Sequence, residues 1–199
     1  ISLAGALVSI GPFITQPIFA HMAMNTPVKN RLFAWITMLQ RLIFAVYVII
    51  MPSLVRISFR LSIVLFLIFW GIFNMFVGSY SPFYNSILTK TTEDNQRGRL
   101  IGYSAAVGNI LAAGVAGLIG IILKNVSFPS NYAWVFGIGT FLLLLDSCDY
   151  IPIQELPDTT VQKKRLSYWG YIKNMVKILK EHPRVAKAVY ANGFIAVSN

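Results

Sequence analysis

Stretches of apolar residues long enough to cross a lipid bilayer recur along this chain. Five stand out, at residues 3–20, 32–54, 61–88, 100–123 and 132–145. A membrane-spanning helix needs about 20 residues, because each residue adds ~1.5 Å against ~30 Å of hydrocarbon. The fifth stretch reaches this length if it continues to about residue 151, and the third is long enough to protrude or to bend at Pro82. The pattern predicts an all-α integral membrane protein, built as a transmembrane helix bundle.

Composition supports a membrane setting and argues against an enzyme. Charged residues make up 12% of the chain, against about 25% in ordinary soluble domains, and the mean hydropathy is +0.63. The single cysteine, Cys148, excludes an intrachain disulfide and a multi-cysteine metal site. The two histidines, His21 and His182, belong to no HExxH pattern, and GxSxG and P-loop patterns are absent from the sequence. We therefore expect no enzymatic activity, no catalytic residue, no metal and no cofactor.

The chain divides into three parts by composition. Residues 1–151 form the predicted bundle, residues 152–185 a polar linker, and residues 186–199 the start of a further transmembrane helix. Because both ends of the chain fall within apolar runs, we interpret it as a fragment of a longer protein. The linker contains an amphipathic basic helix at 167–181, with Trp169, Ile172, Val176 and Leu179 at 3–4 spacing. Such a helix fits either the membrane surface or the underside of a bundle.

The basic residues are distributed unevenly between the two sides of the membrane. Of the 17 Lys and Arg residues, 13 lie in the segments 21–31, 89–99 and 150–187, which share one side. The opposite loops hold three: Arg56, Arg60 and Lys124. The positive-inside rule places the three richer segments in the cytoplasm. The net charge of +10 therefore reflects topology, so the expected partner is the lipid bilayer and nucleic acid is not.

Small residues form a stripe along the fourth apolar stretch. Gly108, Ala112, Ala116 and Gly120 recur every four residues, and Gly117 lies in the adjacent row. Residues at this spacing share one face of a helix, and small side chains let helices in lipid approach closely. The stripe is thus expected to serve helix packing. Static packing and sliding against a partner helix are both compatible with it.

The segment 93–120, EDNQRGRLIGYSAAVGNILAAGVAGLIG, resembles a known family. An acidic residue, then RGR, then a glycine three positions later that opens a Gly-rich helix is similar to the loop between the fourth and fifth helices of major facilitator superfamily (MFS) transporters. The basic loop HMAMNTPVKNRL and the linker at 150–185 also resemble that family. The family's first basic loop usually carries an aspartate, whereas no acidic residue lies between Gln16 and Arg31. The proline that marks antiporters is also missing from the Gly-rich helix.

The resemblance implies a fold and a function. The chain would cover helix two to the start of helix seven of an MFS-type bundle, as part of its N-terminal half. The implied function is that of a secondary active transporter, or permease, which moves a small solute by alternating access, with a proton or sodium as a possible coupling ion. The implied location is the bacterial cytoplasmic (inner) membrane. The alternative is a non-transporting membrane scaffold or receptor with a transporter-like bundle.

Two residues of opposite charge lie at similar membrane depth. Arg41 is ~13 Å from the cytoplasmic face and Asp146 ~8 Å, counting 1.5 Å per residue. Ionisable groups at this depth are costly and often functional, and they usually pair. We expect Arg41 and Asp146 to form an intramembrane ion pair. It would either lock two helices together or take part in substrate or proton coupling.

Polar residues in other spans are candidates for a substrate pathway. In the family that the chain resembles, the fourth helix lines the central cavity and the fifth flanks it. Carried over here, this implies that Asn74 and Tyr80 face the pathway, with Asn109 and Gln16 as further candidates. A hydrogen bond between helices is an equally open role for an amide in the membrane.

Charged residues in two short cytoplasmic loops are candidates for a gate. Glu93, Arg97 and Arg99 lie in one loop, and Lys29 and Arg31 in the other. Ion pairs between these loops would bias an equilibrium between two transporter states. The alternative is that these charges only set topology and remain solvated.

Overall fold

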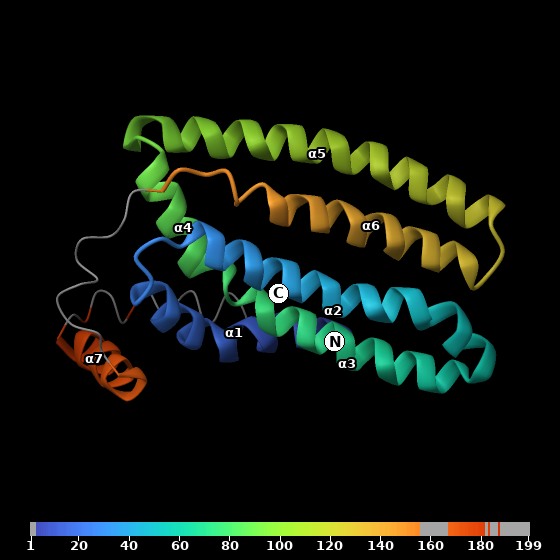
Figure 1. Ribbon diagram of the computed structural model, residues 1–199, viewed down its shortest axis with the longest axis horizontal. Helices are drawn as coiled ribbons and strands as arrows, with labels where there is room; N and C mark the ends of the chain where they lie inside the picture. Colours follow the sequence, from blue (N-terminus) through green and yellow to red (C-terminus); the bar gives the residue numbers. More distant parts are fainter. Residues whose placement is uncertain (1–2, 156–166, 182, 184–186, 188–199) are drawn as a thin grey trace.

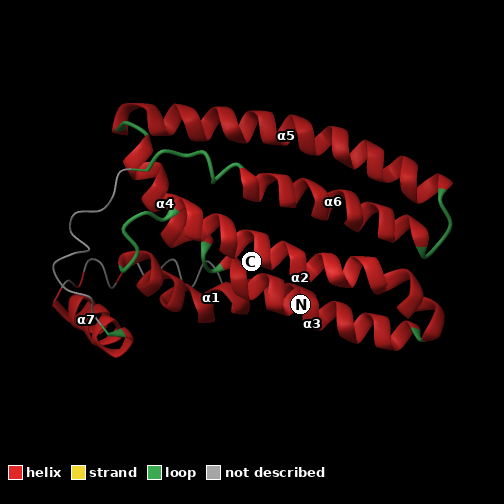
Figure 2. Ribbon diagram, in the orientation of Figure 1, coloured by secondary structure: helices red, strands yellow, loops and turns green. Residues whose placement is uncertain are grey.

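The computed structural model describes residues 3–155, 167–181, 183 and 187, and its regular elements are all helices (Figure 1, Figure 2). The elements are α1 (Leu3–Met24), α2 (Asn30–Ile57), α3 (Phe59–Val77), α4 (Tyr80–Thr91), α5 (Asp94–Asn125), α6 (Ser130–Cys148) and α7 (Tyr168–Glu181). The all-α prediction is confirmed. The amphipathic helix expected in the linker is present as α7. The transmembrane segment expected at 186–199 lies almost entirely outside the described residues.

Five helical stretches are long and apolar enough to cross a membrane, with α3 and α4 counted as one stretch from Phe59 to Thr91. Their outer surfaces carry large apolar side chains: Phe13, Trp35 and Ile49 are each more than 70% exposed. In water, each such side chain would forgo about 1.5–3 kcal/mol of burial free energy. Hydrocarbon removes this penalty. The surface of the bundle therefore suits lipid, as the apolar runs predict.

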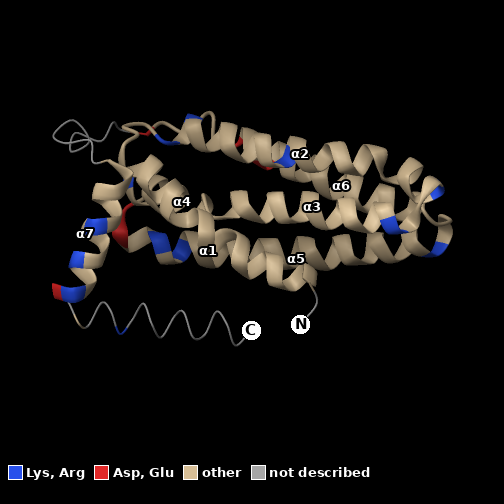
Figure 3. Ribbon diagram, turned by 90° about the horizontal axis from the view of Figure 1, so that it is seen from below, with Lys and Arg blue, Asp and Glu red and all other residues tan. Residues whose placement is uncertain are grey.

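The long helices form a curved row. α1 packs on α3, α3 on α2, α2 on α6, and α6 on α5. Figure 1 shows α5 and α1 at opposite ends of this row, and Figure 3 shows both on the same side of α2 and α6. Because α2 has neighbours on both sides, it carries most of the buried residues, at the 3–4 spacing of one helix face: Phe33, Ile36, Thr37, Gln40, Arg41, Phe44, Tyr47, Val48 and Met51.

The loops expected on one side of the membrane do lie at one end of the bundle. The segments before α2, before α5 and after α6 meet there, together with α4 and α7 (Figure 1). Figure 3 shows basic residues at both ends, with a further group along α7. We call the end where α4, α7 and these three segments meet the linker end. It is the end that the distribution of Lys and Arg assigns to the cytoplasm.

The third apolar stretch is broken, but not at Pro82. α3 ends at Val77 and α4 begins at Tyr80, so the break lies at Gly78 and Ser79. Pro82 occupies the first turn of α4, where its missing N–H group has no intrahelical partner to lose. The expectation of a bend at Pro82 is therefore wrong by three to four residues. The break occurs where α1 passes close to the backbone.

Replacing Gly78 with alanine is expected to destabilise the bundle. A Cβ atom at Gly78 would lie 2.9 Å from the backbone oxygen of Pro12 and 2.9 Å from the backbone nitrogen of Gln16, so α1 itself must move. We expect a loss of about 1–3 kcal/mol, measured as a lower unfolding midpoint in detergent. Gly139→Ala in α6 is the matched control, since a Cβ atom there meets nothing within 4 Å. An equal or higher midpoint for Gly78→Ala would contradict the close approach.

Candidate functional site

Arg41 lies at the centre of a polar cluster inside the bundle. It is 1% exposed, on the face of α2 that turns towards α6 and α4. One guanidinium nitrogen, Nη2, donates to Oδ2 of Asp146 at 2.5 Å and to the hydroxyl oxygen of Tyr80 at 2.5 Å. The other, Nη1, donates to Oγ of Ser147. The expected Arg41–Asp146 pair is therefore present, and it joins three helices.

The two partners of this ion pair differ in exposure. The Arg41 side chain is fully enclosed, whereas the Asp146 side chain is 49% exposed. Asp146 accepts through Oδ2, and its Oδ1 has no hydrogen bond with the described residues. The Nε atom of Arg41 is buried and likewise has no partner within residues 3–155. The site thus combines a fixed cation with a carboxylate that keeps one oxygen available to a proton, a solute or water.

Tyr80 belongs to the Arg41 cluster. The resemblance implies that Tyr80 faces the pathway; in the structure its hydroxyl group is a partner of Arg41, and its ring packs edge-on against Phe33 at 5.4 Å. Ser147, which sequence reasoning missed, also contacts Arg41. The signal was available in principle, because Ser147 follows Asp146 directly. A charged residue in a membrane usually gathers several polar partners.

Asn74 lies at the contact between α1 and α3. It is 3% exposed, and its Nδ2 donates to the carbonyl oxygen of Trp70 in its own helix at 2.8 Å. A Cβ atom at Gly11 would lie 2.9 Å from the carbonyl carbon of Asn74, so the two helices cross tightly here. This position supports the packing role for Asn74 over the pathway role.

The other two pathway candidates lie on different helices, and only α1, which carries Gln16, packs on α3 beside Asn74. Gln16 is exposed on α1, and Asn109 is exposed on α5, at opposite ends of the row of helices (Figure 1). The structure therefore does not bring Asn74, Asn109 and Gln16 together around one cavity. Gln40, which was not among the candidates, is buried beside Arg41 and donates from Nε2 to the carbonyl oxygen of Phe73 at 2.8 Å. That hydrogen bond joins α2 to α3.

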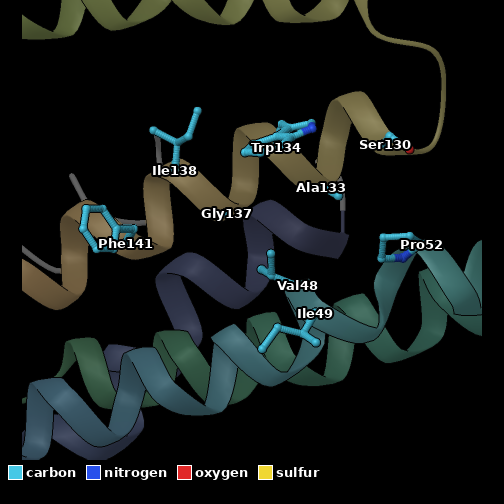
Figure 4. Close-up of a pocket in the computed structure, with 9 residues that line it drawn as sticks. All are labelled: Val48, Ile49, Pro52, Ser130, Ala133, Trp134, Gly137, Ile138 and Phe141. Atoms are coloured by element: carbon cyan, nitrogen blue, oxygen red, sulfur yellow. The ribbon is translucent and has the colours of Figure 1, made fainter.

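A groove between α2 and α6 is apolar. Its volume is ≈ 610 Å³, and Figure 4 shows its lining: Val48, Ile49, Pro52, Ser130, Ala133, Trp134, Gly137, Ile138 and Phe141. Of these, only Ser130 carries a polar side-chain group besides the indole of Trp134. A lining of this kind suits an acyl chain or an apolar side chain, not a polar solute. The groove is therefore not a candidate for the substrate site.

Glu155 is the acidic residue that joins the loops at the linker end. Its side chain is 0% exposed. Oε2 accepts from the backbone nitrogens of Lys29 at 2.6 Å and Asn30 at 2.9 Å, and Oε1 accepts from Nζ of Lys90 at 2.8 Å. Lys29 is the N-cap residue of α2 and provides no side-chain cap of its own. We call this arrangement the Glu155 cap.

The contacts described for the predicted gate residues fall into separate groups. Glu93 accepts a hydrogen bond from Gln96, and Arg97 pairs with Asp94 at 2.7 Å and donates to the carbonyl oxygen of Thr89. Arg31 and Arg99 are exposed and form no ion pair with the described residues. Among the described residues, Glu93 and Arg97 thus make these contacts within residues 89–97. Lys90 and the backbone of Lys29 are linked by Glu155.

The small-residue stripe of α5 has no packing partner in the described part of the chain. A Cβ atom placed at Gly108, Gly117 or Gly120 would meet nothing within 4 Å, and Ala112 and Ala116 are exposed. α5 lies at the end of the row, and its main packing partner among the described helices is α6. The close helix packing expected from the stripe is thus not seen among these residues.

Comparisons with protein-family models, with curated proteins and with solved structures found no match to this chain.

Proposed function

We propose that this chain is part of a secondary transporter of the major facilitator type, which carries a small solute across the bacterial cytoplasmic membrane by alternating access. The observation that carries the proposal is the Arg41 cluster. An arginine buried at membrane depth costs at least ~2.5–3.5 kcal/mol in a single helix, and such residues usually mark an ion or solute path. Its partner Asp146 stays half exposed.

Two further features support the proposal. The segment 93–120 resembles the family's loop between helices four and five, and it opens a helix whose small-residue face is not covered by the described residues. The Glu155 cap ties the segment after α6 to the starts and ends of helices at the linker end. Contacts of this kind, made in one state and broken in another, are what alternating access requires.

One observation favours the alternative, a non-transporting scaffold or receptor. Asn74 is sealed between α1 and α3, and its amide is bonded to its own helix. A scaffold needs only such static contacts. The two functions differ in whether water reaches the Arg41 cluster from both sides of the membrane.

The test is a pair of measurements on the full-length protein in proteoliposomes. We expect uptake of at least one solute from a panel of sugars, amino acids and organic acids, and loss of that uptake in Asp146→Asn. Ser81→Ala is the matched control, because Ser81 lies one residue from Tyr80 but outside the cluster.

The second measurement separates the two functions directly. In a Cys148→Ser background, Ser147→Cys is exposed to a membrane-impermeant maleimide from each side in turn. A transporter gives labelling from both sides, since the cluster becomes accessible first from one side of the membrane and then from the other. Labelling from the linker end alone, or from neither side, would favour the scaffold.

A further inference from the structure

α7 has one face that the bundle does not cover. Tyr168 and Tyr171 contact the ring of His21 near the end of α1, with centroids 5.7 and 5.8 Å apart, and both are half-buried. In contrast, Trp169 is 72% exposed and Val176 is 44% exposed. The helix is therefore attached to the bundle by one edge, and its apolar surface continues beyond that contact.

Basic residues border the uncovered apolar surface. Each residue turns an α-helix by about 100°, so Val176 and Trp169 lie side by side when the helix is viewed along its axis. Lys180 and Lys173 come next around the helix, and Lys177 lies further around in the same direction. All three lysines are exposed. Nearby in sequence are Lys163, Lys164 and Arg165. An exposed Trp flanked by lysines is the composition of helices that lie in the interface of a membrane with anionic lipid.

The direction of α7 fits this role. The long helices run side by side, whereas α7 runs across their end (Figure 3). If the long helices cross the bilayer, α7 lies along its surface. It is also attached to α1, which is at the end of the row and so faces outward (Figure 1).

We propose that α7 docks on anionic phospholipid headgroups at the linker-end surface of the membrane, with Trp169 and Val176 among the acyl chains and Lys173, Lys177 and Lys180 against the phosphates. The occupant of this face is lipid because the face combines apolar and basic groups and lies beside the outermost spanning helix. The proposal does not depend on transport activity.

The test measures depth by spin labelling in the full-length protein. In a Cys148→Ser background, a nitroxide is attached at Val176→Cys, and at Asn174→Cys on the polar face as the matched control. The protein is placed in vesicles of phosphatidylcholine alone, or of phosphatidylcholine mixed with phosphatidylglycerol. Accessibility is compared for molecular oxygen, which enters lipid, and for a water-soluble nickel complex.

With phosphatidylglycerol present, we expect the label at Val176 to be reached by oxygen and shielded from nickel, and the label at Asn174 to show the reverse. Each lysine at an anionic surface changes partitioning about fivefold, so replacing Lys173, Lys177 and Lys180 together by glutamine should reduce docking by about 100-fold. Replacing the same three lysines by arginine should retain docking. Lys124→Gln, at the opposite end, should have no effect.

Three results would overturn the proposal. The Val176 label reached by nickel in both kinds of vesicle would show that α7 stays in water. Shielding from both reagents would show that protein covers the face, either this chain or another. Equal depth with and without phosphatidylglycerol would show that the lysines do not recognise anionic headgroups.

Discussion

Asp146→Asn is expected to destabilise the bundle more than Arg41→Met does. The new asparagine can still accept a hydrogen bond, but the enclosed guanidinium of Arg41 loses its counter-charge and keeps only neutral partners such as Tyr80 and Ser147. Leaving one charge of a buried pair uncompensated costs about 3–5 kcal/mol. Removing Arg41 leaves a carboxylate that is half exposed, so the cost should be nearer to 1–3 kcal/mol. The cost of each substitution is measured as the change in unfolding free energy in lipid bicelles.

The double variant Arg41→Met/Asp146→Asn separates a structural pair from a functional one. Replacing both charges by neutral groups of similar size is often close to neutral for stability. We expect the double variant to recover most of the stability that Asp146→Asn loses. If the pair serves only to hold helices together, transport should recover with it. Recovery of stability without recovery of transport would assign the pair to the transport cycle, and failure to recover stability would show that the two side chains act independently.

Glu155→Gln is expected to release the segment after α6 from the start of α2. Glutamine has nearly the same shape, but it loses the charge, and one acceptor oxygen becomes an NH₂ donor that cannot pair with Lys90. Hydrogen bonds to a charged group contribute about 1.5–3 kcal/mol, and a carboxylate is also favoured at a helix N-terminus. We therefore expect amide hydrogen exchange at residues 29–30 and 151–155 to rise by about 10- to 100-fold.

Glu93→Gln is the matched control for the Glu155 cap. Glu93 is also a loop carboxylate at the linker end, but it is exposed, and its carboxylate bonds only to Gln96 among the described residues. Its substitution should leave exchange at residues 29–30 unchanged. Equal effects of the two substitutions would mean that net charge at this end matters more than the particular contacts of Glu155.

Position along the length of the bundle could be predicted from the sequence, because an α-helix rises by a fixed amount per residue. Counting residues placed Arg41 and Asp146 at a similar level, and the two side chains meet in the structure. Asn74 and Asn109 are both pathway candidates, yet they lie on α3 and α5, which are separated in the row by α2 and α6. Depth does not determine which way a residue faces around its helix, and that depends on which helices are neighbours.

Two features escaped prediction for a related reason. Glu155 caps α2 across 126 positions of the sequence, and no local pattern signals such a contact. A capping search looks for Ser, Thr, Asp or Asn just before the helix, and α2 begins after Lys29. The break at Gly78 depends on the close passage of α1, whereas Pro82 was the conspicuous residue in the sequence. Both features are products of tertiary contact.

The distance in sequence between α2 and its cap has a consequence for biosynthesis. The ribosome completes α2 long before residue 155 emerges, since chains are made from the N-terminus at about 5–20 residues per second. Until the sixth helix has been inserted, the first amides of α2 must be satisfied by water. The linker end of the nascent bundle therefore closes late, and a chain that stalls before residue 155 leaves that end open to quality control.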